Sequence, residues 1–383
     1  MDIQEKHKFL IIAPRFHTNL YYRAIALQND GNKVKVLVLY KGKSEFYQNI
    51  DIETISLSIF SKIVLKISSF LKKSNLKSDF ELRIQSPQLK IIKIIKSFNP
   101  DFIILKAYQN NLALKTLIIS KLLNIKVLML TQTPYTHIKG SKFLFKLNIK
   151  LFKFLGVHSF ITPIKSNYEA FKNFGIKNVF YIPFVFPNQN IDNKNLNTDY
   201  IKILSIGKFV KRKNQILLLK TVNQLIKNNY KIKLTFIGEK SDNEYFNEIN
   251  DFLKENNISK FIEIKTNFDY RQTLEEYKSH DLFILPSFKE PAAYSPVEAL
   301  AFGLPVICST ENGTKCYIEN GKNGYIFESN NSEDLKEKII NLISDKNKLI
   351  DFSKNALISA KENHSLESFS SRIYQITQNK QIN

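Results

Sequence analysis

The feature that most constrains the fold of this chain is the alternation of short apolar segments with longer helical patterns along its whole length. Segments such as DFIILKA and DLFILPS are apolar through their centres and lack the in–out alternation of a half-exposed strand. Strands of this kind are typical of parallel sheets that helices cover on both faces. The sequence therefore predicts an α/β fold.

The expected strands form two sets of five, with a segment rich in Asn and Asp between them. In the first half they span 8–14, 33–39, 101–107, 126–132 and 159–164, and in the second half 201–207, 231–238, 261–265, 281–287 and 305–309. A chain of 383 residues suits two domains of this size. We predict a doubly wound, Rossmann-like domain over 1–186, a linker over 187–199 and a second such domain over 200–362. The last helical pattern, 363–383, is a candidate to cross back onto the first domain.

The net charge of +21 is divided unevenly between the two halves. Residues 1–200 carry 30 Lys and Arg against 12 Asp and Glu, whereas residues 201–383 carry 26 against 23. A Lys-rich codon bias would raise both halves alike, so the asymmetry predicts an acidic partner for the N-terminal half. Nucleic acid and an anionic membrane surface are the two candidates.

Other features of the composition bear on the cellular compartment. The two cysteines exclude a disulfide framework and a CxxC metal site, and they fit a reducing cytoplasm. No apolar run approaches 18 residues, and the polar start of the sequence differs from a signal peptide. We therefore expect a cytoplasmic protein without a membrane-spanning helix.

The segment FILPSFKEPAAYSPVEALAFGLPVI, residues 283–307, carries the strongest signal for chemistry, because it runs from strand to loop to helix to strand. Ser295 to Glu298 has the form of a capping box, which predicts a helix that begins at Ser295 and presents free N–H groups to an anion. Gly207 and Gly238 each end an expected strand. Either they let a ligand approach the backbone, or they form simple tight turns.

These segments resemble the family 4 retaining glycosyltransferases, whose members have the two-domain GT-B fold with the domains facing a central cleft. Glu290 and Glu298, with seven residues between them, match the paired glutamates of that family. The stretches SIGKFVKRKNQILLL, SHDLFILPS and GLPVICSTENGTKCYIENGKNGYIF match its surrounding motifs in order. The resemblance covers about residues 201–345, and the first half matches only in general plan.

The resemblance implies a role for each matching residue on the side of a nucleotide-sugar donor such as a UDP- or GDP-sugar. Glu290 would bind sugar hydroxyls, and Glu298 would bind the ribose. Lys208, where the family usually has Arg, and Lys213 would neutralise the diphosphate, and Gly207 would leave room for it. The backbone at Ala293, Tyr294 and Ser295 would cradle the donor. No DxD-like pair or metal cluster is evident, so we expect no metal and no cofactor besides the donor.

The sequence departs from the family at several positions. Ala292 and Ala293 stand where an aromatic residue and Gly are frequent, Asn312 replaces Gly, and Cys316 replaces Glu. The family often has a His after the strand at 126–132, where this chain has Thr131, Gln132 and Thr133. Gln132, His137 or the donor phosphate itself is the candidate for that role, and His17 is a further candidate on the acceptor side.

A basic amphipathic pattern occupies residues 141–156. Lys142, Lys146, Lys150 and Lys153 recur at helical spacing among Phe, Leu and Ile. Such a helix either packs on the core with a solvated Lys face or lies in a membrane interface. A second basic stretch at 61–78 favours the membrane, and with it peripheral attachment to the inner face of the cytoplasmic membrane.

The leading hypothesis is thus a retaining, metal-independent hexosyltransferase that acts on a lipid-linked or oligosaccharide acceptor in bacterial surface polysaccharide synthesis, such as lipopolysaccharide, O-antigen or capsule. A nucleotide-sugar epimerase with the same fold, a non-enzymatic basic binding protein and an inactive partner subunit are the alternatives. We expect no nucleic-acid partner, because the chain has no Trp and no RRM, KH or helix-turn-helix signature.

Overall fold

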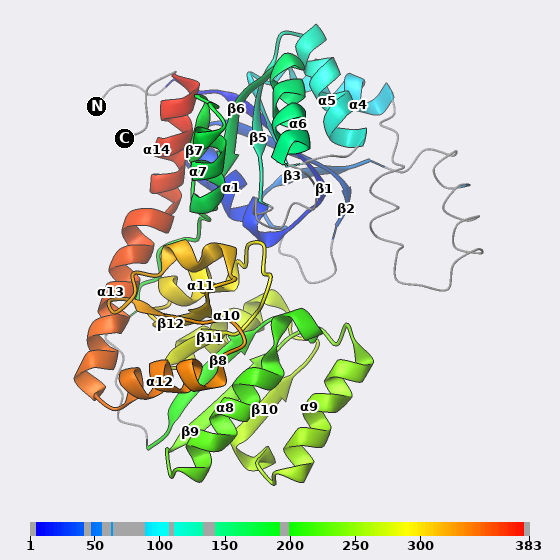
Figure 1. The fold of residues 1–383 in the computed structure, drawn as a ribbon. Coiled ribbons are helices and arrows are strands. Elements are labelled where there is room, and N and C mark those ends of the chain that lie inside the picture. Colours follow the sequence, from blue (N-terminus) through cyan, green and yellow to red (C-terminus); the bar gives the residue numbers. More distant parts are fainter. Residues whose placement is uncertain are drawn as a thin grey trace. The chain divides into compact units, whose positions relative to one another are not determined.

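The computed structural model describes residues 5–41, 47–55, 63, 89–106, 111–132, 142–191 and 199–378 (Figure 1). The chain forms two compact units. Unit 1 comprises Met1–Ile182 and Phe369–Asn383, and unit 2 comprises Pro183–Ser368. Most of the expected linker, residues 192–198, lies outside the described residues.

Unit 1 is built on a seven-stranded parallel sheet in the order β3-β2-β1-β4-β5-β6-β7. The strands are β1 (Lys8–Arg15), β2 (Lys33–Tyr40), β3 (Asp51–Thr54), β4 (Phe102–Leu105), β5 (Lys126–Leu130), β6 (Val157–Thr162) and β7 (Val179–Tyr181). The order reverses between β1 and β4, as in a doubly wound sheet, and such a reversal is where ligands commonly bind.

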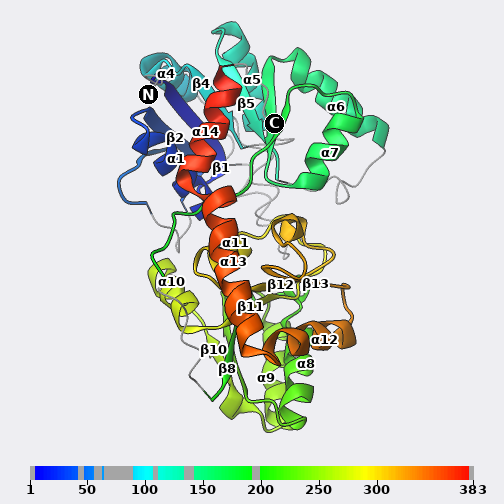
Figure 2. The ribbon, with the colours of Figure 1, turned by 90° about the vertical axis from the view of Figure 1, so that its left-hand side faces the viewer.

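The helices of unit 1 are α1 (Thr18–Asn29), α4 (Leu89–Phe98), α5 (Asn111–Leu122), α6 (Lys142–Phe154) and α7 (Lys165–Asn173). Helices α4 to α7 share one buried core with the sheet, to which they contribute Ile91, Leu117, Ile149 and Phe171. They therefore cover the same face of it. The C-terminal helix α14 (Leu366–Thr377) also packs on unit 1, where Ser370 Oγ donates to the Ala26 carbonyl at 3.0 Å (Figure 2).

Unit 2 has a six-stranded parallel sheet in the order β10-β9-β8-β11-β12-β13. The strands are β8 (Ile201–Ile206), β9 (Ile232–Ile237), β10 (Ile262–Lys265), β11 (Leu282–Leu285), β12 (Val306–Ser309) and β13 (Gly324–Phe327). The helices are α8 (Gln215–Lys227), α9 (Asn243–Glu255), α10 (Tyr270–Ser279), α11 (Ser295–Ala301), α12 (Ser332–Ile343) and α13 (Lys346–His364). Here the order reverses between β8 and β11.

The predicted α/β class is confirmed, and each of the ten expected strands is present within a few residues of its expected bounds. Three further strands, β3, β7 and β13, were not predicted. Within the part of the chain that the structure describes, no helix combines the length and the apolar character that crossing a bilayer requires.

Candidate functional site

A buried carboxylate lies between two cations at the end of the unit 2 sheet. Glu290 is 5% exposed. Its Oε2 atom lies 2.7 Å from Lys213 Nζ and also contacts the Arg212 guanidinium. Burial by itself would raise the pKa of Glu290, but Lys213 and Arg212 outweigh it and hold that pKa below its ordinary value. The carboxylate is therefore ionised at neutral pH.

Backbone contacts place both partners of this ion pair. Lys213 ends the short 3₁₀ turn Lys211–Lys213, which follows β8 and leads directly into α8. Glu290 follows β11, and its N–H and carbonyl bond to Glu311 O at 3.1 Å and Gly313 N at 2.9 Å, respectively. Because β8 and β11 are the neighbouring strands at which the order reverses, the pair lies at the switch point of the sheet.

Gly207 follows β8 and Gly238 follows β9, and the structure favours glycine at these two positions for different reasons. Neither residue has a positive φ. A Cβ atom on Gly238 would lie 2.0 Å from the Gly207 carbonyl oxygen, so the two backbones require Gly at this position. The three atoms nearest to a Cβ atom on Gly207 would all belong to the Lys213 side chain, with Cδ and Cε at 3.2 Å. The lack of a Cβ atom on Gly207 therefore leaves room for the Lys213 side chain to reach Glu290.

This difference predicts opposite behaviour for two matched substitutions. Gly238→Ala forces apart two backbone segments and is expected to lower the free energy of unfolding by about 3 kcal/mol or more. Gly207→Ala displaces a flexible side chain, so the free energy of unfolding of this variant should stay within about 1 kcal/mol of the wild-type value. Its affinity for nucleoside diphosphates should fall. Denaturant unfolding and nucleotide titration of both variants test this. Equal destabilisation would show that Gly207, too, is required by packing alone.

The predicted capping box at Ser295 is wrong. Helix α11 begins at Ser295 with Tyr294 as its N-cap residue, and no side chain caps it. All seven residues of the helix are buried, and the Glu298 carboxylate accepts hydrogen bonds from Tyr270 Oη at 2.6 Å and Tyr277 Oη at 2.8 Å. Glu298 is turned toward α10 and does not fold back onto its own N-terminus.

The surroundings of Glu298 predict a pH-dependent stability. Burial raises the pKa of Glu298 even though the two tyrosine hydroxyls oppose that shift. The folded state then holds the proton more tightly than the unfolded state, so wild-type stability falls as pH rises from the ordinary Glu pKa through the raised one. Glu298→Gln keeps an acceptor for the hydroxyls without the buried charge.

We therefore expect Glu298→Gln to gain stability relative to wild type as pH increases, and to match it most closely near pH 4. Glu298→Ala should be less stable than Glu298→Gln by about 1–3 kcal/mol at every pH, because neither side chain titrates and the Tyr277 hydroxyl loses its best acceptor. Thermal unfolding of the three proteins between pH 4 and 8 measures both effects. A pH-independent difference between Glu298→Gln and wild type would refute the raised pKa.

The other predicted donor residues fall into two groups. Ala293, Tyr294 and Ser295 lie in the loop and first turn of α11, close in sequence to Glu290. The exposed side chain of Lys208 pairs with Glu239 at 2.7 Å, whereas the ion pairs of Glu290 are with Lys213 and Arg212. Arg212 makes the contact with Glu290 beside Lys213 and was not predicted. Its position next to Lys213 in the basic run KRK is the only signal for it in the sequence.

The predicted acceptor-side residues lie in unit 1 or outside the described part. His17 is the N-cap residue of α1 and makes no side-chain cap. Gln132 follows β5, and its Nε2 atom is buried without a hydrogen-bond partner among the described residues, as is Thr131 Oγ1. His137 and Thr133 lie outside the described residues.

Asn312, one of the departures from the family pattern, has a structural role. It is 1% exposed, and its Oδ1 atom accepts hydrogen bonds from Thr314 N at 3.0 Å and Thr314 Oγ1 at 2.8 Å. Its backbone bridges to Glu290. Asn312 therefore helps to fix the loop against which Glu290 is held.

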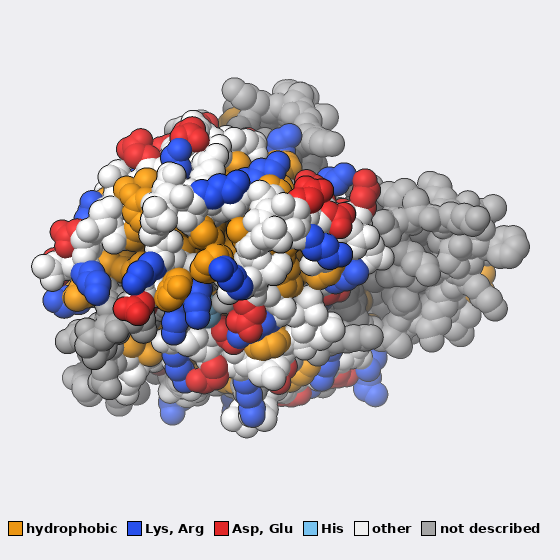
Figure 3. All heavy atoms as spheres, turned by 90° about the horizontal axis from the view of Figure 1, so that it is seen from below, with side chains coloured by type: hydrophobic (Ala, Val, Ile, Leu, Met, Phe, Trp, Pro, Cys, Tyr) orange, Lys and Arg blue, Asp and Glu red, His pale blue; other side chains and the backbone are white. Residues whose placement is uncertain are grey.

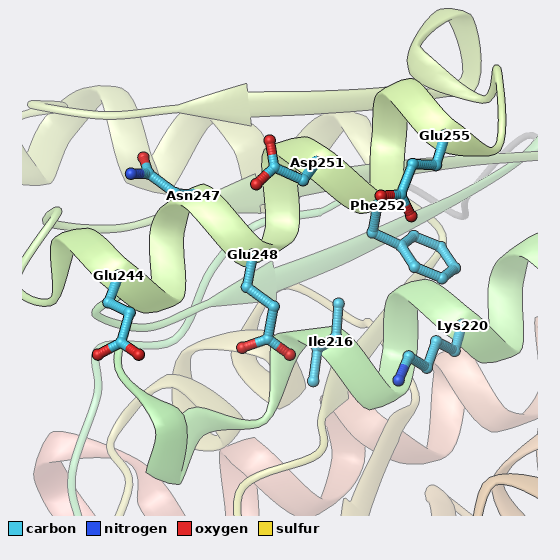
Figure 4. Close-up of a pocket in the computed structure, with 8 residues that line it drawn as sticks. All are labelled: Ile216, Lys220, Glu244, Asn247, Glu248, Asp251, Phe252 and Glu255. Atoms are coloured by element: carbon cyan, nitrogen blue, oxygen red, sulfur yellow. The ribbon is translucent and has the colours of Figure 1, made fainter.

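Two features of the described residues limit which ligands fit elsewhere in unit 2. No cluster of three or more His, Cys, Asp or Glu side chains within them could hold a metal ion. The charged residues that line a groove of about 480 Å³ between α8 and α9 are one lysine, Lys220, and four carboxylates, Glu244, Glu248, Asp251 and Glu255 (Figure 4). Four carboxylates repel a diphosphate, so the cations at Glu290 are the better anion site.

Known proteins resemble part of this chain in sequence. Residues 187–358 match the family model of the glycosyl transferases group 1. Spore coat protein SA of Bacillus subtilis is 30% identical over 154 residues, which is 38% of this chain and 40% of that protein. The capsular polysaccharide biosynthesis glycosyltransferase CapM of Staphylococcus aureus is 27% identical over 167 residues, 42% of this chain and 43% of CapM. The chain thus spans about two fifths of the length of the curated relatives it matches.

The likeness in fold extends to both units. The crystal structure of the Anabaena protein HepE in complex with UDP has a TM-score of 0.72 to this chain at 15% sequence identity. The match covers 98% of this chain and 100% of HepE. The chain therefore has the GT-B fold, with two parallel-sheet α/β units.

Proposed function

We propose that this chain, whose residues 187–358 match the family model of the glycosyl transferases group 1, transfers a hexosyl unit from a nucleoside diphosphate sugar to an acceptor. The observation that carries the proposal is the contact of Glu290 with Lys213 and Arg212 at the switch point of the unit 2 sheet. It brings together two cations for a diphosphate and a carboxylate for a sugar, from the two segments that match the family.

The ion pairs suggest how donor binding reorganises the site. Glu290 contacts both Lys213 and Arg212 and neutralises part of their charge. A diphosphate that pairs with these cations takes over that role and leaves the carboxylate free to accept hydrogen bonds from sugar hydroxyls. As the glycosidic bond breaks, negative charge grows on the leaving diphosphate, and fixed cations stabilise it, with roughly 3 kcal/mol for each well-placed group in a dry site.

The proposal includes retention of configuration at the anomeric carbon and no requirement for a metal ion. Lys213 and Arg212 supply the positive charge that a metal would otherwise provide to the leaving group. The donor phosphate is the proposed acceptor of the incoming hydroxyl's proton, which suits attack on the face that the leaving group vacates. Glu298, buried against Tyr270 and Tyr277, is the proposed ligand of the ribose hydroxyls.

For the acceptor we propose a lipid-linked or oligosaccharide glycan of a bacterial surface polysaccharide, built at the inner face of the cytoplasmic membrane. The similarity to CapM, a glycosyltransferase of capsular polysaccharide biosynthesis, supports this pathway. The basic N-terminal half supports an acceptor that is anionic or membrane-bound, since residues 1–200 carry 30 basic against 12 acidic side chains.

A thermal-shift screen of nucleotide sugars tests the proposal. A UDP- or GDP-sugar at 100 times its Kd should stabilise unit 2 by about 2.7 kcal/mol, in buffer containing EDTA. The matching nucleoside diphosphate should also stabilise the protein, and the free sugar should not. Stabilisation by no nucleotide sugar, or only after Mg²⁺ is added, would contradict the donor site as proposed.

A further inference from the structure

Helix α5 exposes a stripe of large apolar side chains. Leu114, Ile118 and Leu122 are 38%, 42% and 80% exposed, respectively. Their spacing of four residues places them on one side of the helix. The opposite side, with Leu112, Ala113 and Leu117, is buried in the core of unit 1. Helix α5 is therefore apolar on both sides, and only one of them is covered.

Helix α6 shows the same pattern. Leu147, Leu151 and Phe154 are 52%, 46% and 73% exposed, and they recur at i, i+4 and i+7. Lys121 joins the ends of the two helices, because its Nζ atom donates to the Phe154 carbonyl at 2.8 Å and lies 4.3 Å from the centre of the Phe154 ring. The exposed stripes of α5 and α6 thus belong to neighbouring helices.

Helices α4, α5 and α6 form one outer surface. All three bury apolar side chains in the same core on the same face of the sheet, and they lie side by side in both ribbon views (Figures 1 and 2). We call the side chains that these helices turn away from that core the α4–α6 surface. On it the apolar stripes are flanked by the exposed lysines Lys90, Lys93, Lys96, Lys121, Lys150 and Lys153.

The three helices of this surface carry charge of a single sign, although Lys90 on α4 pairs with Glu53 of β3 at 3.3 Å. The sequences of α4, α5 and α6 contain no Asp or Glu. The face of the molecule that Figure 3 shows has acidic and basic side chains interspersed. An apolar patch flanked mainly by lysines fits a ligand that offers both hydrocarbon and negative charge.

We propose that the α4–α6 surface docks on an anionic lipid bilayer, with Leu122 and Phe154 inserted among the acyl chains and the lysines at the headgroups. Nucleic acid would match the charge but would leave these apolar side chains in water. The proposal concerns a surface outside the donor site of unit 2, so it stands or falls separately from the proposed reaction. The sequence indicated the stretches 141–156 and 61–78 for the membrane, and of these three helices only α6 lies in them. The side chains of Lys142 and Lys146, and nearly all of the stretch at 61–78, lie outside the described part.

Sedimentation of the full chain with vesicles tests this docking. The vesicles are phosphatidylcholine with or without 30% phosphatidylglycerol, at about 50 mM salt. Wild type is expected to sediment with the anionic vesicles and to dissociate at about 500 mM salt, where screening shortens the reach of its charges. The variant Ile118→Gln with Leu122→Gln and Phe154→Gln should lose at least about tenfold in partition coefficient.

The electrostatic contribution is tested by Lys150→Glu with Lys153→Glu. Each Lys near an anionic surface contributes about fivefold to binding, so this pair should lose about 30-fold or more. Ile358→Gln, at a side chain that is 52% exposed on α13, is the matched apolar control. Lys227→Glu with Lys254→Glu, two exposed lysines in the last turns of α8 and α9, is the matched charge control. Both controls should bind as wild type does.

All variants replace exposed side chains, and their melting temperatures and nucleotide affinities should match those of wild type. Equal loss in the control variants would overturn the proposal, because binding would then follow overall charge or hydrophobicity. Wild-type binding by the α5 and α6 variants would overturn it as well. So would sedimentation that requires added nucleic acid in place of anionic lipid.

Discussion

Replacing Glu290 by Gln is expected to lower the rate of sugar transfer by about 10²- to 10³-fold while leaving nucleoside diphosphate binding intact or stronger. The carboxylate is proposed to bind the donor sugar, and the amide cannot provide the same charged acceptor. In wild type, however, a diphosphate must displace Glu290 from Lys213 and Arg212. The neutral side chain removes that competition.

Two measurements on Glu290→Gln separate these effects: kcat/KM for transfer and the Kd of the nucleoside diphosphate by calorimetry. Glu276→Gln is the matched control, because Glu276 is a largely buried carboxylate of the same unit that pairs with Lys265 at 2.7 Å. It should retain wild-type transfer. If Glu290→Gln loses nucleotide binding and transfer together, the carboxylate acts by organising the cations and not by binding the sugar.

Replacing Lys213 by Ala should weaken binding of the nucleoside diphosphate by about 10- to 100-fold and leave binding of the nucleoside almost unchanged. The Lys213 ammonium is a point charge that meets phosphate but has no partner on the base or ribose. Its side chain is 13% exposed, so solvent screens the interaction only weakly. Lys213→Ala also leaves Arg212 as the remaining cation at Glu290.

Comparison of UDP or GDP with the corresponding nucleoside measures the phosphate contribution directly. Lys265→Ala, which removes a Lys of similar exposure from the Glu276 ion pair, is the control and should affect neither ligand. A similar loss of affinity for the nucleoside and its diphosphate would place Lys213 in a general structural role.

Several of the strands that the sequence predicted have a continuous apolar centre. Strands β4 and β11, with the sequences FIIL and LFIL, are buried at every position, so hydrophobicity alone identifies them. The missed strands lie at sheet edges. Strand β3 has the sequence DIET with no buried residue, and β7 has only three residues. Their pairing depends on a neighbouring strand that is distant in sequence, which no local pattern reveals.

The candidate site was predictable where a motif carried it and not where packing decided the contacts. Glu290 and Lys213 follow from matched segments, and the structure brings them together. The partners of Glu298 could not be predicted, because Tyr270 and Tyr277 lie on α10 and reach Glu298 only through the packing of two helices. The capping box failed for the same reason: the side chain that could close it is held by α10.

The initial anomer released from an α-linked nucleotide sugar tests the central claim most directly. The donor from the thermal-shift screen is incubated with the protein and a glycan acceptor or water, and proton NMR records the product before mutarotation. A retaining glycosyltransferase should give the α anomer first and free nucleoside diphosphate in equal amount, with both signals lost in Glu290→Gln. An initial β anomer would contradict retention, and an epimerised nucleotide sugar formed without any nucleoside diphosphate would show that the chain is an epimerase instead.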